Sequence, residues 1–333
     1  MKRLLRNITG DDAAQIIDID ALYRNQPDLK IRKTVLEYLL ATLVIKKTLG
    51  EGWWQAAEDE VASQMAGGRR GSPNTHPLTP FLVALRRKFY DPTLAGQVIN
   101  LAIDLLTLIN LPEANESLEQ KVPELRSKRG QAFHDAWFEI RMASTFIHKG
   151  MSAKLIQASP KEKRPDIEVN CPDGRVFVEC KTRKRLDPEE RSSPAEYRKK
   201  MKVRLSGVAD LINNASAQVH SLGSPTLIAV NIDILDNAVG SAELKQLVSM
   251  MEHYEIGNPH VNGIILVIER VATSPASANQ INLVVSWGQE LHLQYNVTNP
   301  ALPNPTEFFR ILMDPKTTKV PPTLFLTHYA KTH

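Results

Sequence analysis

The residues with the clearest chemical potential are Asp166, Glu179 and Lys181, which lie within a stretch of 16 residues. Alternating apolar and polar residues predict one strand at 165–170 and another at 175–181. Because side chains alternate between the faces of a strand, Glu179 and Lys181 share one face of the second strand. Each predicted strand buries an apolar face and presents its acids on the other.

The connection between the two strands decides whether their acids meet. The sequence Cys171-Pro172-Asp173-Gly174 has turn chemistry, since proline fixes φ and glycine allows a positive φ. A four-residue loop pairs Asn170 with Arg175 and places Asp166 opposite Glu179 on the same face. A three-residue loop shifts the register by one and places the acids on opposite faces. The chemistry considered next therefore requires a loop of even length.

Two facing carboxylates repel each other unless a cation lies between them or one of them takes up a proton. Their hard oxygen atoms suit Mg²⁺ or Mn²⁺, which keep coordination sites for water and for a phosphate oxygen. The backbone carbonyl of Cys180 is a further candidate ligand. Lys181 would orient or deprotonate an attacking water, or stabilise a charged phosphorane. The alternative is an ordinary half-solvated hairpin with scattered surface charges.

A basic block surrounds this cluster. Residues 154–204 carry 15 Lys/Arg and 9 Asp/Glu, whereas residues 205–333 carry 6 and 10. Charge alone favours a solvated surface. Beside two acids and a lysine, the block instead predicts a surface for a phosphate backbone. Its residues are Arg183, Lys184, Arg185, Arg198, Lys199, Lys200, Lys202 and Arg204.

The elements around the cluster predict an α/β fold. A helix is expected from Gln131 to about Lys149, and a second one begins at the capping box Ser193-Pro194-Ala195-Glu196. With the strands, the order α-β-β-β-α-β-α-β describes a mixed sheet flanked by helices. The other expected strands are 152–158, 226–233, 263–269 and 281–287, with a further helix from about Ser241.

Pro165-Asp166, followed after twelve residues by Glu179-Cys180-Lys181, resembles the motif of the PD-(D/E)XK nuclease superfamily. This family has the restriction-endonuclease-like fold, and its α-β-β-β-α-β core matches the order expected for 131–233. The resemblance implies that Asp166, Glu179 and the Cys180 carbonyl hold Mg²⁺ or Mn²⁺ and that Lys181 is catalytic.

Three other residues extend the comparison. Glu139 matches the acid that many members carry on the preceding helix, where it often joins the metal site. Gln218 resembles the glutamine of the resolvase-like and Mrr-like branches, and helical arithmetic places it at the edge of a buried stripe. Glu168 lies on the acid face but outside the motif, so it is either a surface residue or a ligand of a second metal ion.

Residues 1–128 are expected to form a separate, mostly helical domain, with 129–333 as the nuclease-like domain (core 131–233, extension 234–333). In the first domain one helix follows Asp28 and ends at Gly50, and another begins at Asp91-Pro92. The segment 67–80, with Arg69 and Arg70, is interpreted as a connecting loop. Target choice, homodimer formation and contact with a partner protein are the roles considered for this domain.

The composition of the chain limits the classes of protein to which it can belong. With 42% apolar and 23% charged residues, the 333-residue chain is not typical of a disordered or fibrous protein. Its two cysteines, Cys171 and Cys180, cannot build a disulfide framework and are typical of a reducing compartment. The chain shows neither a signal peptide nor an apolar run of the ~20 residues that a membrane span needs. These features predict a cytoplasmic protein without membrane contact.

Two functions are consistent with the sequence. The first is a Mg²⁺-dependent endonuclease that acts on DNA, in restriction, anti-phage defence or repair, with RNA as the weaker alternative substrate. The second is a catalytically inactive nucleic-acid-binding or scaffold protein with the same fold. The intact set of Asp166, Glu179 and Lys181 favours the first.

Overall fold

The computed structural model describes residues 29–66, 75–87, 92–157, 164–171, 174–182, 194–219, 224–234, 249, 258, 260–277, 280–295 and 305–313. By their contacts these residues form two compact units, a helical unit that runs to Ser144 and a sheet unit that begins at Thr145. The boundary lies inside a helix, whereas the sequence predicted it between residues 128 and 129.

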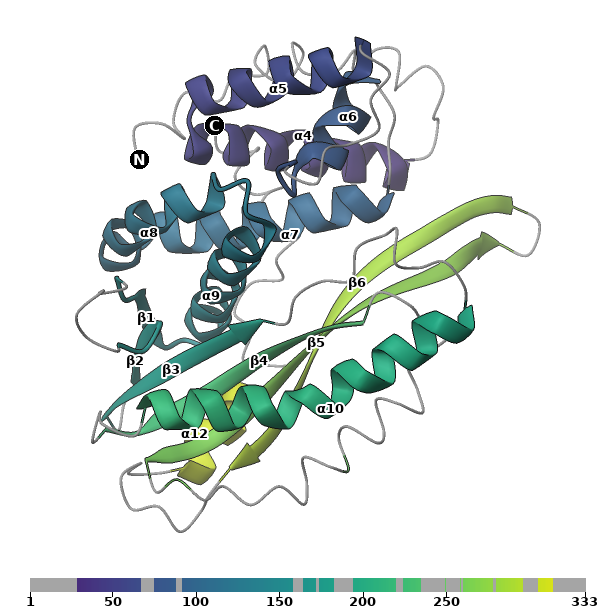
Figure 1. Cartoon of the computed structure of the whole chain (residues 1–333). Helices are drawn as coiled ribbons and strands as arrows, with labels where there is room; N and C mark the ends of the chain where they lie inside the picture. Colours follow the sequence, from purple (N-terminus) through teal and green to yellow (C-terminus); the bar gives the residue numbers. More distant parts are fainter. Residues whose placement is uncertain are drawn as a thin grey trace. The chain divides into compact units, whose positions relative to one another are not determined.

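Every described element of the helical unit is an α-helix, as the sequence predicted (Figure 1). Helix α4 packs against α7, and both lie where the sequence placed them. Of the loop expected at 67–80, residues 67–74 with Arg69 and Arg70 lie outside the described residues. The helices are α4 (Leu29–Leu49), α5 (Glu51–Ala66), α6 (Thr79–Arg86), α7 (Pro92–Ile109), α8 (Pro112–Leu125) and α9 (Gly130–His148).

Gly50 ends α4 in a backbone conformation that suits glycine. Its φ is +86°, a value that L-residues rarely adopt. The Nε of Arg126 donates a hydrogen bond to the carbonyl oxygen of Leu49 (2.7 Å), which satisfies one of the last carbonyls of the helix. A Cβ at Gly50 would lie 3.0 Å from Nη2 of the same arginine. A larger residue would therefore strain the backbone and disturb the helix cap together.

The sheet unit contains a mixed six-stranded sheet with the order β1-β2-β3-β4-β5-β6. Strands β1 to β3 form an antiparallel meander, and α10 then connects β3 to the parallel strand β4. Strand β5 is parallel to β4, and β6 is antiparallel to β5. The elements are β1 (Ser152–Leu155), β2 (Ile167–Cys171), β3 (Gly174–Thr182), α10 (Pro194–Val219), β4 (Thr226–Ile234), β5 (Val261–Ser277), β6 (Gln280–Tyr295) and α12 (Pro305–Met313).

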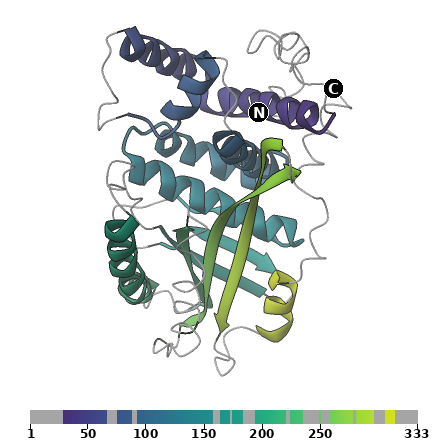
Figure 2. The same ribbon diagram turned by 90° about the vertical axis from the view of Figure 1, so that its right-hand side faces the viewer.

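Helices cover both faces of this sheet. Helix α10 lies on one face and α12 on the other (Figures 1 and 2). At the end of α9, the ring of Phe146 lies 6.4 Å from that of Phe308 on α12. Strand residues on both faces are fully buried, for example Val178 and Ile228. The α/β class and the order from α9 to β4 are therefore as predicted.

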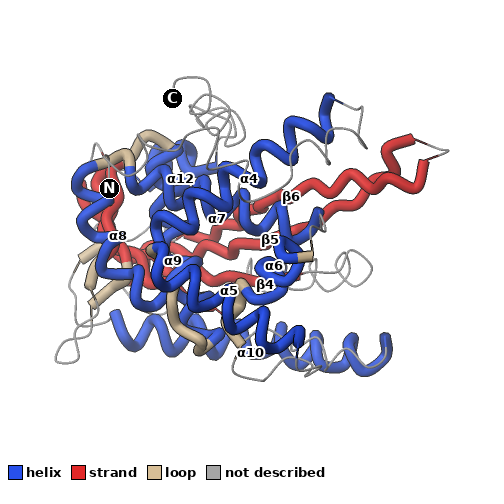
Figure 3. Tube along the Cα trace, turned by 90° about the horizontal axis from the view of Figure 1, so that it is seen from above, coloured by secondary structure: helices blue, strands red, loops and turns tan. Residues whose placement is uncertain are grey.

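The last two strands are longer than predicted. Strand β5 has 17 residues and β6 has 16. Pairing between β4 and β5 ends at Arg270, and the hairpin continues beyond that point (Figure 3). The helix expected from Ser241 falls largely on residues outside the described ranges, and α12 was not predicted.

Two smaller expectations can also be compared with the structure. Cys171 and Cys180 are not joined in a disulfide bond. None of the described helices is long and apolar enough to cross a bilayer.

His76 is a buried polar residue of the helical unit. Its Nδ1 accepts a hydrogen bond from the N–H of Leu78 (3.1 Å), and its Nε2 lies 2.8 Å from the carbonyl oxygen of Leu125. These contacts require the neutral ring with its proton on Nε2. The rings of Trp53 and Phe133 pack edge-on against it. Burial lowers the pKa of His76 below its ordinary value.

We expect His76 to make the protein less stable in mild acid. Since its pKa is lower in the folded state, the unfolded state binds more protons below about pH 6.5, and the free energy of unfolding falls as the pH decreases. His76→Leu should be less stable at pH 7 by about 1–3 kcal/mol, because the Leu78 N–H loses its acceptor. Its stability should depend less on pH between 7 and 5. Urea unfolding would measure both, and equal pH slopes would contradict this role.

Candidate active site

Asp166 is fixed by hydrogen bonds to both neighbouring strands. Its carbonyl oxygen accepts a bond from the N–H of Ile156 after β1 (2.8 Å), and its own N–H donates to the carbonyl of Val178 on β3 (3.0 Å). Its carboxylate Oδ2 accepts a bond from the N–H of Cys180 (2.7 Å). The carboxylate is therefore held against β3.

The register of β2 and β3 is the one that the site requires. Asn170 pairs with Arg175, as predicted, and pairing continues to Cys171 and Gly174, which leaves a turn of even length. The regular pairing ends at Ile167. Contrary to the prediction, Asp166 is therefore not the strand partner of Glu179. Proline at position 165 has no N–H to continue the ladder. Instead, the carboxylate of Asp166 accepts a hydrogen bond from the N–H of Cys180.

Glu179 and Lys181 form a close, partly buried ion pair. The Lys181 Nζ donates to Glu179 Oε1 at 2.5 Å. The Glu179 side chain is 6% exposed and that of Lys181 is 23% exposed. The carboxylate is thus almost removed from water, while the ammonium group retains some access to solvent.

The pKa values of Glu179 and Lys181 depend on each other and on the charge of Asp166. Burial raises the pKa of Glu179, the charge of Asp166 raises it further, and Lys181 offsets only part of the effect, so the pKa reaches about 7. Burial by itself would lower the pKa of Lys181, but the charge and hydrogen bond of Glu179, together with the charges of Asp166 and Cys180, outweigh burial and raise the pKa. Lys181 is therefore a cation at neutral pH, which suits it to stabilising negative charge and not to accepting a proton.

The donor set fits a small divalent cation. Two carboxylates next to one lysine leave an excess of negative charge, which a bound cation would neutralise. Mg²⁺ needs only one or two carboxylates because it keeps several waters. Asp166 and Glu179 would be the two carboxylate ligands. Among the described residues no group of three or more His, Cys, Asp or Glu side chains is placed to hold a metal ion, so a third protein ligand would be a backbone carbonyl such as that of Cys180.

Glu168 has protein cations as partners. Its carboxylate lies 3.3 Å from Lys154 Nζ on β1 and 3.8 Å from Arg175 Nη1 on β3. Of its two proposed roles, this arrangement supports that of a surface residue. The guanidinium carbon of Arg175 also lies 5.1 Å from the centroid of the Phe177 ring. Sequence alternation placed Arg175 and Phe177 on this face, but it did not single them out.

Glu139 lies in the helical unit and is 6% exposed. Its Oε2 lies 2.6 Å from the Nζ of Lys121 on α8, which is itself buried. The structure therefore gives this acid a structural ion pair. The partners lie 18 positions apart in the sequence, and no local pattern could have indicated the pair. A water-mediated contact between Glu139 and a metal ion stays a prediction.

The other predicted site residues lie on or near α10. Gln218 is half-buried beside the buried residues Ala215 and Val219, at the edge of the stripe as expected. Of the predicted nucleic-acid contacts, Arg183, Lys184 and Arg185 lie outside the described residues. Helix α10 carries the other predicted contacts, whose side chains the structure does not describe: Arg198, Lys199, Lys200, Lys202 and Arg204.

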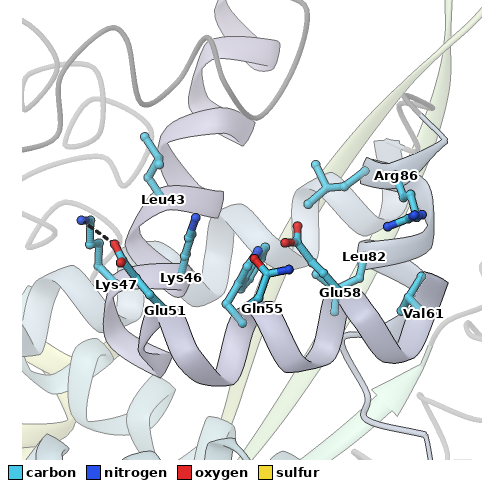
Figure 4. A pocket seen from close by; sticks show the side chains of 11 residues that line it. Leu43, Lys46, Lys47, Glu51, Gln55, Glu58, Val61, Leu82 and Arg86 are labelled. Carbon is cyan, nitrogen blue, oxygen red and sulfur yellow. Dashed lines mark hydrogen bonds and ion pairs between the residues drawn. The ribbon is translucent and has the colours of Figure 1, made fainter. Parts of the chain in front are cut away.

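A separate cavity of about 290 Å³ lies in the helical unit, between α4, α5 and α6 (Figure 4). Its lining mixes apolar side chains such as Leu43 and Leu82 with charged ones. One of its acids, Glu51, forms an ion pair with Lys47 (3.0 Å).

Comparisons of the chain with protein-family models, with curated proteins and with solved structures find no match.

Glu179 should make the metal-free protein less stable as the pH rises. Its pKa is higher in the folded state, so the folded state binds more protons, and the free energy of unfolding falls from about pH 4.5 towards pH 7. Glu179→Gln should reduce this decline, by an amount on the order of 2 kcal/mol. Urea unfolding in EDTA would measure it. Parallel pH curves for wild type and variant would contradict the link.

Glu139→Ala should lower the free energy of unfolding by about 3 kcal/mol, because Lys121 is then buried without this partner. The double variant Lys121→Met/Glu139→Leu is the control, since an apolar pair of similar size should recover most of the stability. Urea unfolding and Mg²⁺ titration would be run on all three proteins. A Glu139→Ala protein with wild-type stability and weakened Mg²⁺ binding would contradict the structural role.

Proposed function

We propose that the sheet unit has the restriction-endonuclease-like fold and that the protein is a Mg²⁺-dependent endonuclease acting on DNA. The observation that carries the proposal is the cluster of Asp166, Glu179 and Lys181. Two linked carboxylates and a lysine that is charged at neutral pH occur at the spacing of the PD-(D/E)XK motif, directly before β2 and on the adjacent strand β3. The element order from α9 to β4 also agrees with the core of that fold.

Each residue has a separate task in this proposal. Asp166 is held rigidly by β1 and β3, so its carboxylate is pre-positioned. Glu179 is poised between its protonated and charged forms near neutral pH, and cation binding would favour the charged form. When bound, Mg²⁺ supplies Lewis-acid polarisation of a phosphate oxygen and a more acidic water. Lys181 stabilises the negative charge that develops on the phosphoryl group during hydrolysis.

Restriction, anti-phage defence and repair are the processes that such an activity would serve, and the cytoplasm is the proposed compartment. The basic residues between Arg183 and Arg204 would follow the phosphate backbone. The helical unit would supply target choice, a homodimer contact or contact with a partner protein. The competing proposal is a catalytically inactive nucleic-acid-binding or scaffold protein, in which the same three residues only stabilise the fold.

Lys181→Ala should abolish most cleavage and leave metal binding in place. The carboxylates stay, while the transition state loses a cation, so we expect a rate loss on the order of 10²-fold or more. Plasmid, linear, branched and single-stranded DNA would be assayed with Mg²⁺ and with EDTA at pH 8.5, where Glu179 is ionised. Asp166→Asn should lose both metal binding and cleavage.

Lys128→Ala is the matched control, because this lysine is 59% exposed in the helical unit and pairs with Glu60. It should cleave at the wild-type rate. If Lys181→Ala also cleaves at the wild-type rate, the proposed active site is wrong. If the wild type binds DNA and cleaves none of the substrates, the inactive binding protein is the better description.

A further inference from the structure

The face of β3 that carries Glu179 and Lys181 continues with an aromatic ring and an arginine. Strand residues two apart share a face, so Phe177 is the next residue after Glu179 on this face and Arg175 follows it. Two residues of a strand span about 7 Å. Arg175 lies over the ring of Phe177, with 5.1 Å between the guanidinium carbon and the ring centroid. The ring is half-buried, whereas the Arg175 side chain is 57% exposed.

One carboxylate orients two exposed cations at this place. Glu168 lies 3.8 Å from Arg175 Nη1 and 3.3 Å from Lys154 Nζ, and its side chain is only 14% exposed. The Lys154 side chain is 44% exposed. A carboxylate that is mostly buried needs a cationic partner, and this one has two. The local charge is one positive in excess, and both cations remain accessible to a ligand.

A flat guanidinium that lies over an aromatic ring suits a nucleic-acid base. Bases stack on aromatic rings and on arginine planes, and every base offers a π-face for this contact. A lysine beside the platform is suited to the phosphate next to the stacked base. In a continuous duplex the base faces are covered by their neighbours, and exposing one costs a few kcal/mol. The platform therefore fits an unpaired base better than a paired one.

We propose that Phe177 and Arg175 form a stacking platform for an unpaired DNA base and that Lys154 contacts the adjacent phosphate. The inference rests on the proposed nuclease function, because it places the platform about two strand residues from Glu179. It specifies the substrate class as DNA with a single-stranded segment at the cleavage site, such as an overhang, a flap or a gap.

Binding in EDTA tests the platform without cleavage. The full-length chain would be titrated into a fluorescent oligonucleotide that contains 2-aminopurine, once as a single strand and once within a continuous duplex. The wild type should prefer the single strand and change the 2-aminopurine emission through stacking. Phe177→Leu should weaken single-strand binding roughly 5- to 100-fold and change duplex binding far less.

Variants of arginine separate stacking from charge. Arg175→Lys keeps the charge but lacks the plane, so it should lose the stacking signal and keep the salt dependence of binding. Arg310→Ala is the matched control, because Arg310 is 59% exposed and pairs with Glu307 on α12. It should bind as the wild type does. Arg175→Ala provides a second test of the platform if Phe177→Leu fails to fold.

The outcomes distinguish this inference from the proposed nuclease activity. Equal losses for single strand and duplex, or no preference of the wild type for the single strand, would overturn the platform even if Mg²⁺-dependent cleavage is observed. A selective loss in Phe177→Leu and Arg175→Lys would support the platform, and it would do so even if no substrate is cleaved.

Discussion

A carboxylate that is almost fully buried beside a second acid is a costly arrangement in a folded chain. Glu179 is in this position, and the pairing of β2 with β3 enforces it. Asp166 is tied by its backbone to both adjacent strands and by its carboxylate to the Cys180 N–H. The two acids therefore cannot easily separate to relieve their repulsion. Lys181 relieves part of it, and the raised pKa of Glu179 reflects the part that is left.

Buried acids of the helical unit are compensated differently by neighbouring cations. Arg141 lies 3.3 Å from Asp104, so this buried acid has its own cation. Lys121 lies 2.6 Å from the buried Glu139 and 3.2 Å from Glu124, whose side chain is 38% exposed. At the β2–β3 site Lys181 offsets only part of the effect that burial and Asp166 have on the pKa of Glu179. This incomplete compensation, rather than burial alone, distinguishes a candidate cation site from a structural ion pair.

The candidate site lies on the polar face of strands β1 to β3. Regular alternation along β3 places Lys181, Glu179, Phe177 and Arg175 on one face. Strand β2 adds Glu168 to this surface, and β1 adds Lys154. The opposite face is apolar and closely packed, since Ile167, Val169, Val176 and Val178 are fully buried. Packing of that face fixes the position of the polar one, so a ligand would meet a surface with little freedom to rearrange.

Local patterns in the sequence determined the element order and the register of the candidate site. Alternation of polar and apolar residues and the Cys171–Gly174 turn were sufficient for β2 and β3, because strand periodicity and turn chemistry act over a few residues. Helical periodicity was sufficient in the same way, together with a glycine end for α4 and α9 and a proline start for α7. The length of β5 and β6 was not predictable from their apolar centres, since the two strands extend beyond these centres by pairing with each other in a hairpin.

Tertiary structure decided which charges meet. Lys121 and Glu139 come from different helices, and Glu168 collects its partners from β1 and β3. Contacts of this kind depend on how elements pack, which no short stretch of sequence encodes. The state of Glu179 is the clearest example. The sequence placed it beside Asp166 and Lys181, but only the burial of its carboxylate in the folded sheet raises its pKa to about 7.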